Sequence, residues 1–105
     1  MTSSSIASTG NPVPSAAELR KARFWDRIAH KYAADPIADP AGYEATLRRV
    51  QGLLSPPHEV LEIGCGTGMT ALRLAGGTRH YLATDVSAGM IAIARERQAA
   101  DRKST

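Results

Sequence analysis

The chain has a single cysteine and no long hydrophobic run. Cys65 stands alone among 105 residues, which excludes an internal disulfide framework. No apolar stretch approaches the roughly twenty residues that a membrane span requires. The first fifteen residues contain no lysine or arginine and no continuous apolar core, so a secretory signal is not expected. The sequence therefore predicts a cytoplasmic protein with no membrane partner.

Histidine is scarce, and neither sign of charge dominates. The three histidines, His30, His58 and His80, lack the spacing of metal ligands, so no metal site is predicted. The net charge is only +3, and acidic residues are interleaved with the basic clusters at 20–23 and 95–103. No aromatic residue lies in the second cluster to stack on a base. Both clusters are interpreted as solvated helix faces, and no nucleic-acid partner is predicted.

Residues 1–14 are rich in serine, threonine, glycine and proline. Such a composition buries too little apolar surface to offset the entropy of ordering, so a disordered N-terminal arm is predicted there. A length of 105 residues allows one small domain, which is expected to occupy residues 15–105.

Two helices are predicted ahead of the first strand. Ser15 and Glu18 match the capping-box pattern of a helix start, and apolar residues then recur at spacings of three and four. Trp25 of this stripe is expected to pack in the core, whereas core packing and closure over a ligand are both open for Tyr32. Asp35-Pro36 ends the helix, since proline disfavours helical geometry in the residue before it.

The second helix is expected to begin at Pro40, with Asp39 as its N-cap. Residues 55–57, Ser-Pro-Pro, end it. A short apolar segment over 59–63 runs straight into glycines and is predicted to be a buried strand. A second strand is predicted over 80–84.

A helix over 67–75 is expected between these strands, with Leu72 facing the core and Gly76-Gly77 at its end. Ser87 can cap a last helix that runs to about Arg102. A strand, a crossover helix and a strand in succession imply a parallel pair. The predicted fold is α/β: the N-terminal part of a Rossmann-like doubly wound parallel sheet, with two strands and flanking helices.

The loop between the first strand and its helix carries glycines at 64, 66 and 68. Gly64 permits backbone angles that a Cβ would forbid, and Gly66 and Gly68 allow close approach of a ligand and packing against the strand. Asp85 ends the next strand, where its carboxylate can accept hydrogen bonds from two ribose hydroxyls. The alternative for Asp85 is a helix cap or a solvated turn residue.

The identity of the ligand follows from two departures from the dinucleotide fingerprint. Met69 stands at the sixth position, where that fingerprint has glycine or alanine. Glu62 lies two residues before Gly64, and its carboxylate would repel a pyrophosphate. A cationic ligand without phosphate suits the loop better. S-adenosylmethionine, which carries an ammonium and a sulfonium, is therefore favoured over NAD or FAD.

Three segments together resemble the class I S-adenosylmethionine-dependent methyltransferases. Val60-Leu-Glu-Ile-Gly-Cys-Gly-Thr-Gly68 is similar to motif I of that family, and Tyr81-Leu-Ala-Thr-Asp-Val-Ser-Ala-Gly-Met90 to the segment that follows it. Phe24-Trp-Asp-Arg-Ile-Ala-His-Lys-Tyr32 resembles the lead-in helix of small-molecule members of the ubiquinone/menaquinone methyltransferase type. The resemblance covers roughly residues 20–100.

This resemblance implies a cofactor site for S-adenosylmethionine. Glu62 and the backbone of the loop would hold the methionine portion, Asp85 the ribose, and Val86, with Met90 nearby, the adenine, while Tyr32 closes over the cofactor. Cys65 is expected to be a small packing residue and not a nucleophile. No catalytic residue can be named. The implied cofactor-binding set is Tyr32, Glu62, Ile63, Gly64, Cys65, Gly66, Gly68, Asp85, Val86 and Met90.

The chain also departs from the family, because it has counterparts of only the first two strands. It is therefore expected to be an N-terminal portion, either an incomplete gene product or an artificially shortened chain, that is weakly active or inactive alone. Both strands would then have an unpaired edge, which favours self-association.

The function implied is methylation of a small molecule. An NAD- or FAD-dependent oxidoreductase fragment and a non-enzymatic interaction module remain as alternatives.

Overall fold

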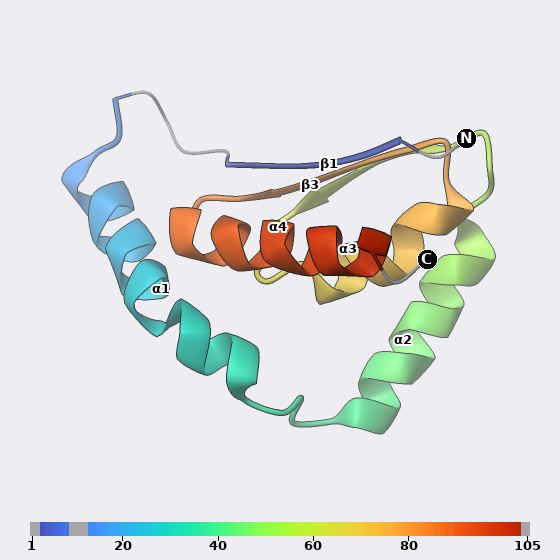
Figure 1. The fold of residues 1–105 in the computed structure, drawn as a ribbon, viewed down its shortest axis with the longest axis horizontal. Coiled ribbons are helices and arrows are strands. Elements are labelled where there is room, and N and C mark those ends of the chain that lie inside the picture. The colour runs from blue at the N-terminus through green and yellow to red at the C-terminus, as the bar shows by residue number, and fades with distance from the viewer. Residues whose placement is uncertain (1–2, 9–12, 104–105) are drawn as a thin grey trace.

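The computed structural model describes residues 3–8 and 13–103, which form a parallel sheet with helices packed against it (Figure 1). The α/β class and the parallel strand pair predicted from the sequence are confirmed. None of the described helices is long and apolar enough to cross a membrane. In chain order the elements are β1 (Ser3–Ser8), α1 (Ala16–Ala34), α2 (Pro40–Leu53), β2 (Glu59–Ile63), α3 (Met69–Leu74), the 3-10 turn η1 (Ala75–Gly77), β3 (His80–Asp85) and α4 (Ala88–Lys103).

The sheet has three strands in the order β1-β3-β2, one more than the sequence predicted. The additional strand, β1, lies within the segment expected to be a disordered arm, so that expectation is wrong for residues 3–8. The rest of that segment at 1–2 and 9–12 lies outside the described residues. Pairing with an exposed strand edge requires only backbone donors and acceptors, and a serine-rich composition gives no sign of it.

β1 covers one of the two strand edges that were expected to be open. It runs parallel to β3, with Ser3 opposite His80 and Ser8 opposite Asp85. On α4, Arg95 donates a hydrogen bond to the carbonyl oxygen of Ile6 at 3.1 Å. In the described part of the chain, β2 is left as the edge strand on the opposite side.

The predicted starts of α1 and α2 are confirmed. The Ser15 hydroxyl accepts a hydrogen bond from the Glu18 backbone N–H at 3.1 Å, so Ser15 caps α1. Asp39 caps α2 in the same way through the Gly42 N–H at 3.1 Å, with Pro40 at the first helical position. α1 and α2 are separated by the short segment at 35–39.

α3 is shorter than predicted. It begins at Met69, where the sequence pattern suggested 67, and gives way to η1 after Leu74. Leu72, expected to face the core, is only half-buried, whereas Ala71 and Leu74 are buried. Two residues of the expected helix belong to the glycine loop, and the buried face of the short helix is the one that Ala71 and Leu74 share.

The core lies between the sheet and the helices, which occupy one side of the sheet in Figure 1. Burial along β2 alternates, as expected when successive side chains point to opposite faces. Leu61 and Ile63 therefore share one face of β2 and are 60% and 81% exposed. The strand at 59–63 forms as predicted, but the expectation that it is buried is wrong, because β2 has no buried residue and lies at an edge of the sheet in the described chain. The buried hydrophobic cluster consists of Leu47, Cys65, Ala71, Leu74, Tyr81, Ala83 and Ile91.

Candidate functional site

The glycine loop, residues 64–68, leads from β2 into α3. Gly64, Gly66 and Gly68 all have positive φ angles, of 73°, 55° and 82°, which favour glycine over residues with a Cβ. A Cβ on Gly68 would lie 2.9 Å from the Cβ of Ala94 on α4, whereas a Cβ on Gly64 or Gly66 would meet no atom within 4 Å. The third glycine is thus needed for packing against α4, and the first two border open space.

Asp85 ties this loop to the turn before α4. One carboxylate oxygen accepts a hydrogen bond from the Gly66 backbone N–H at 2.9 Å, and the other accepts one from the Ser87 backbone N–H, also at 2.9 Å. Asp85, the last residue of β3, therefore joins the loop to this turn, and it also lines a cavity. Each oxygen retains a lone pair for a further donor.

Two cavities meet at the glycine loop. We call the first the acidic cavity: it has a volume of about 560 Å³ and is lined by two acidic residues, Glu62 and Asp35. The second, the apolar cavity, has a volume of about 320 Å³, with Asp85 as its only charged lining residue within the described chain. Tyr32, Gly64 and Gly66 line both.

The remaining lining residues come from several elements. For the acidic cavity these are Pro36, Ile37, Ala38, Tyr43, Cys65, Thr67, Met69 and Thr70, and for the apolar cavity they are Trp25, Ile63, Val86 and Met90.

Glu62 is held in place by β3. The Tyr81 hydroxyl donates a hydrogen bond of 2.8 Å to one of its carboxylate oxygens, and the Thr84 hydroxyl donates one of 2.9 Å to its backbone oxygen. Burial, followed by this hydrogen bond to Glu62, raises the pKa of Tyr81 above its ordinary value. The phenol therefore stays protonated and keeps donating to Glu62 at neutral pH.

The thiol of Cys65 is unreactive near neutral pH. Its side chain is buried, and burial raises the pKa of the thiol to about 11, with a further contribution from the negative charges of Glu62 and Asp85. A thiol with this pKa is almost entirely protonated near neutral pH, and the thiolate is the nucleophilic form. The arrangement agrees with the packing role expected from the sequence.

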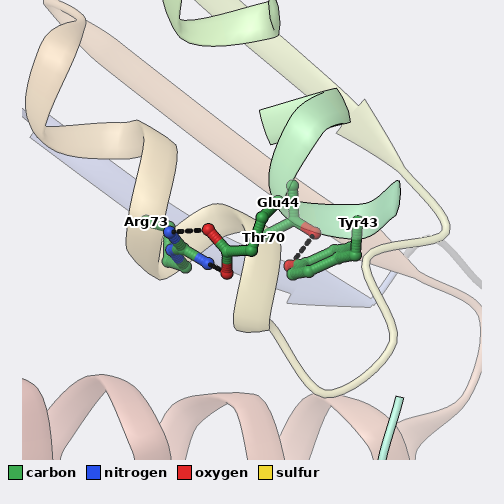
Figure 2. Close-up of polar contacts among 4 residues, drawn as sticks. All are labelled: Tyr43, Glu44, Thr70 and Arg73. Carbon is green, nitrogen blue, oxygen red and sulfur yellow. Dashed lines mark hydrogen bonds and ion pairs between the residues drawn. The ribbon is translucent and has the colours of Figure 1, made fainter. Parts of the chain in front are cut away.

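α2 forms a wall of the acidic cavity and is fastened to α3. Figure 2 shows the Tyr43 hydroxyl hydrogen-bonded to the Thr70 hydroxyl, at 2.9 Å, beside an ion pair between Glu44 and Arg73. Both terminal guanidinium nitrogens of Arg73 donate to the Glu44 carboxylate, and this hydrogen bonding lowers the pKa of Glu44. Tyr43 and Thr70 are thereby fixed along the cavity.

The structure brings together all of the predicted cofactor-binding residues except one at the two cavities. Gly68 lies in neither and packs against α4 instead. In the described residues no group of three histidine, cysteine or acidic side chains is placed to hold a metal ion.

Several cavity residues were not foreseen, and Trp25 and Asp35 are two of them. Trp25 was expected in the core, but it is 39% exposed and lines the apolar cavity together with Tyr32. The two residues are seven apart on α1 and so lie on the same helix face. Because Tyr32 was a candidate site residue, this spacing could have indicated Trp25 as a second one. Asp35 was identified only as part of a helix stop, and nothing in the local pattern indicates that it lines a cavity.

This combination of a parallel sheet, a glycine loop and a carboxylate at the end of the next strand defines the class of α/β proteins that bind nucleoside-containing ligands. Comparison with known proteins narrows the class. Residues 60–104 match a family described as "Methyltransferase domain". The predicted resemblance to the class I S-adenosylmethionine-dependent methyltransferases is thereby confirmed, with partial coverage of the chain.

Three curated proteins are similar to parts of this chain. Malonyl-[acyl-carrier protein] O-methyltransferase of Pectobacterium atrosepticum is 43% identical over 65 residues, which are 55% of this chain and 26% of that protein. Methyltransferase GfsG of Streptomyces halstedii is 35% identical over 94 residues, 84% of this chain and 34% of that protein. Chondramide synthase cmdD of Chondromyces crocatus is 50% identical over 44 residues, 42% of this chain and 1% of that protein.

The chain thus spans between a quarter and about a third of the length of the first two relatives. No solved structure gives a significant match.

Proposed function

We propose that this chain binds S-adenosylmethionine around the glycine loop and forms the cofactor-binding part of a small-molecule methyltransferase. The observation that carries the proposal is the meeting of an acidic and an apolar cavity at Gly64 and Gly66. S-adenosylmethionine has a cationic amino-acid end and a flat, largely uncharged adenosine end. A ligand of this kind matches both cavities.

The acidic cavity fits the cationic end. Glu62 and Asp35 place two carboxylates along it, and no lysine, arginine or histidine is among the described residues that line it. Opposite charges in a partly enclosed site attract far more strongly than in bulk water. The same carboxylates would repel a pyrophosphate, which argues against NAD and FAD.

The apolar cavity fits the adenosine end. Asp85 retains acceptor capacity for the ribose hydroxyls, and Ile63, Val86 and Met90 offer an apolar surface to the adenine. Tyr32 lines both cavities, and in this binding mode it would cover the junction between the two ends of the ligand.

The bound cofactor would supply an activated methyl group on its sulfonium. The residues of this chain would hold and orient the cofactor and keep water from it, which is the main protein contribution to such a transfer. We assign no catalytic base within the chain. A small-molecule acceptor is proposed from the resemblance of residues 24–32 to the lead-in helix of small-molecule methyltransferases. By its name, the relative from Pectobacterium atrosepticum methylates an oxygen of a malonyl group that is carried on an acyl-carrier protein.

Isothermal titration calorimetry of the purified chain tests the cofactor proposal. S-adenosylmethionine should bind with micromolar affinity, and NAD should bind at least about tenfold more weakly because of its pyrophosphate. Circular dichroism first establishes that the sample is folded. A folded sample that releases no heat with S-adenosylmethionine, or that prefers NAD, would contradict the proposal and revive the oxidoreductase alternative.

We also propose self-association through β2. This strand is an edge of the sheet in the described chain, and its Leu61 and Ile63 are 60% and 81% exposed. Sedimentation velocity at two protein concentrations tests the idea, which fails if the chain stays monomeric at both.

A further inference from the structure

α1 carries two aromatic side chains into the apolar cavity. Trp25 and Tyr32 both line it, with ring centroids 6.0 Å apart and ring planes at 85°. They are 39% and 52% exposed, so burial in the core does not fix them. Their position over the cavity depends on how α1 is attached to the rest of the protein.

The first attachment is made by Asp26, the neighbour of Trp25. One carboxylate oxygen of Asp26 accepts hydrogen bonds from the Ser87 hydroxyl at 2.5 Å and from the Gly89 backbone N–H at 2.8 Å. Ser87 is fully buried, and its own backbone N–H donates to Asp85 at 2.9 Å. A continuous polar chain therefore links α1 to the carboxylate proposed to hold the ribose.

The second attachment lies at the other end of the aromatic pair. Arg97 on α4 donates a hydrogen bond of 3.1 Å to the carbonyl oxygen of Ala33, the neighbour of Tyr32. Its other terminal nitrogen donates to the Thr67 hydroxyl in the glycine loop at 2.6 Å. The segment of α1 from Trp25 to Tyr32 is thus fastened at both ends to elements that form the site.

The first attachment also requires close approach of two backbones. A Cβ on Gly89 would lie 3.1 Å from the Cα of Asp26, so only glycine at this position leaves α1 where it is without displacement. The contact is between residues on different helices, and a larger residue would push α1 away from α4.

We propose that Asp26 is a positioning residue for cofactor binding, which holds α1 on the N-terminal end of α4 so that Trp25 and Tyr32 cover the apolar cavity. This inference rests on the proposed function. Asp26 is not among the residues that line either cavity, so it acts through Trp25 on one side and through Ser87 and Asp85 on the other.

Substitutions at Asp26 and Gly89 test the proposal in two ways. Asp26→Ala removes the acceptor, whereas Asp26→Asn keeps an oxygen that can accept both hydrogen bonds and should restore function. Gly89→Ala leaves the Asp26 side chain in place, but its Cβ should displace α1. Alanine favours helix more than glycine does, so a loss of binding in this variant would not come from a weakened α4. Gly52→Ala on α2 is the matched control, because a Cβ there meets no atom within 4 Å.

Two quantities are measured on the four variants. Calorimetry gives the dissociation constant for S-adenosylmethionine, and acrylamide quenching of fluorescence in the ligand-free protein reports on Trp25, the only tryptophan. Asp26→Ala and Gly89→Ala should weaken cofactor binding about tenfold and make Trp25 more readily quenched. Asp26→Asn and Gly52→Ala should stay within about twofold of the wild type in both.

The outcomes separate this inference from the proposed function. If the wild type binds the cofactor but Asp26→Ala binds it equally well with unchanged quenching, the positioning role is overturned and the proposed function stands. If the wild type does not bind the cofactor, the proposed function fails, and the quenching series still decides whether Asp26 holds α1. If Asp26→Ala does not fold, the test is the comparison of Gly89→Ala with Gly52→Ala. Equal dissociation constants and equal quenching for these two variants would overturn the proposal.

Discussion

The acidic and apolar cavities share the glycine loop but differ in charge and in the way their walls are held. The acidic cavity is formed by strand ends and by α2, which an ion pair and a hydrogen bond fasten to α3. The apolar cavity has one charged lining residue in the described chain, and one wall is α1, which is attached through Asp26 and Arg97. A ligand that fills both must be cationic at one end and apolar at the other.

The largest expected effect falls on the apolar cavity. Asp85→Asn should weaken binding of both S-adenosylmethionine and free adenosine by about a hundredfold, because two hydrogen bonds from ribose hydroxyls to a charged acceptor are lost or weakened. Calorimetry with the two ligands measures this. Glu96→Gln, an exposed position on α4 that lines neither cavity, is the control. If Asp85→Asn bound adenosine as tightly as the wild type does, Asp85 could not be the residue that binds the ribose hydroxyls.

A smaller and more selective effect is expected in the acidic cavity. Glu62→Gln should weaken S-adenosylmethionine binding about tenfold, since the cationic end loses one carboxylate while Asp35 remains. Adenosine binding should stay within about twofold of the wild type, because in the proposed binding mode adenosine occupies the apolar cavity, which Glu62 does not line. If Glu62→Gln weakened both ligands equally, the two cavities could not recognise separate ends of the cofactor.

The smallest effect is on stability at high pH. The folded-state pKa of Cys65 is raised from 9.0 to about 11, so the folded protein holds this proton more tightly than the unfolded chain does. The resulting stability is present below pH 9 and is lost as the pH rises toward 11. Relative to pH 7, the free energy of unfolding at pH 10.5 should fall by about 1–2 kcal/mol more in the wild type than in Cys65→Ala.

Denaturant titrations at pH 7 and pH 10.5 measure this difference. The pKa of Tyr81 is raised mainly by burial and by its hydrogen bond to Glu62, and these causes are present in both proteins, so its contribution largely cancels in the comparison. If the free energy of unfolding had the same pH dependence in the two proteins, the pKa of the Cys65 thiol would not be raised by burial or by the charges of Glu62 and Asp85.

Local sequence was a good guide wherever a structural feature depends on near neighbours. The caps at Ser15 and Asp39 each join residues three apart, and the strand at 59–63 is marked by its apolar run and the glycines after it. The strand end at Asp85 follows from the same pattern. These features bring Glu62, Gly64, Gly66 and Asp85 together, which is the centre of the candidate site.

The sequence was a poor guide where partners lie far apart in the chain. Trp25 belongs to an apolar stripe of the kind that usually packs in a core, yet the placement of α1 leaves it at a cavity. Asp35 looks like a helix stop, and only the fold of the segment at 35–38 against the glycine loop makes it part of the acidic cavity. The periodicity of a helix shows which of its residues lie on one face, but it does not show whether a core or a cavity lies against that face.

The amino-acid sequence alone determined the glycine loop, the strands β2 and β3, the helix caps and the position of Asp85 at a strand end, because each depends on backbone geometry and contacts within a short segment. Only the tertiary structure decided that residues 3–8 pair with β3 and that Asp26 accepts hydrogen bonds from Ser87 and Gly89. The physical reason is separation along the chain: Asp26 and Ser87 are 61 residues apart, and Ile6 and Arg95 are 89 apart. Such contacts exist only once the sheet and helices have packed, and no local pattern encodes them.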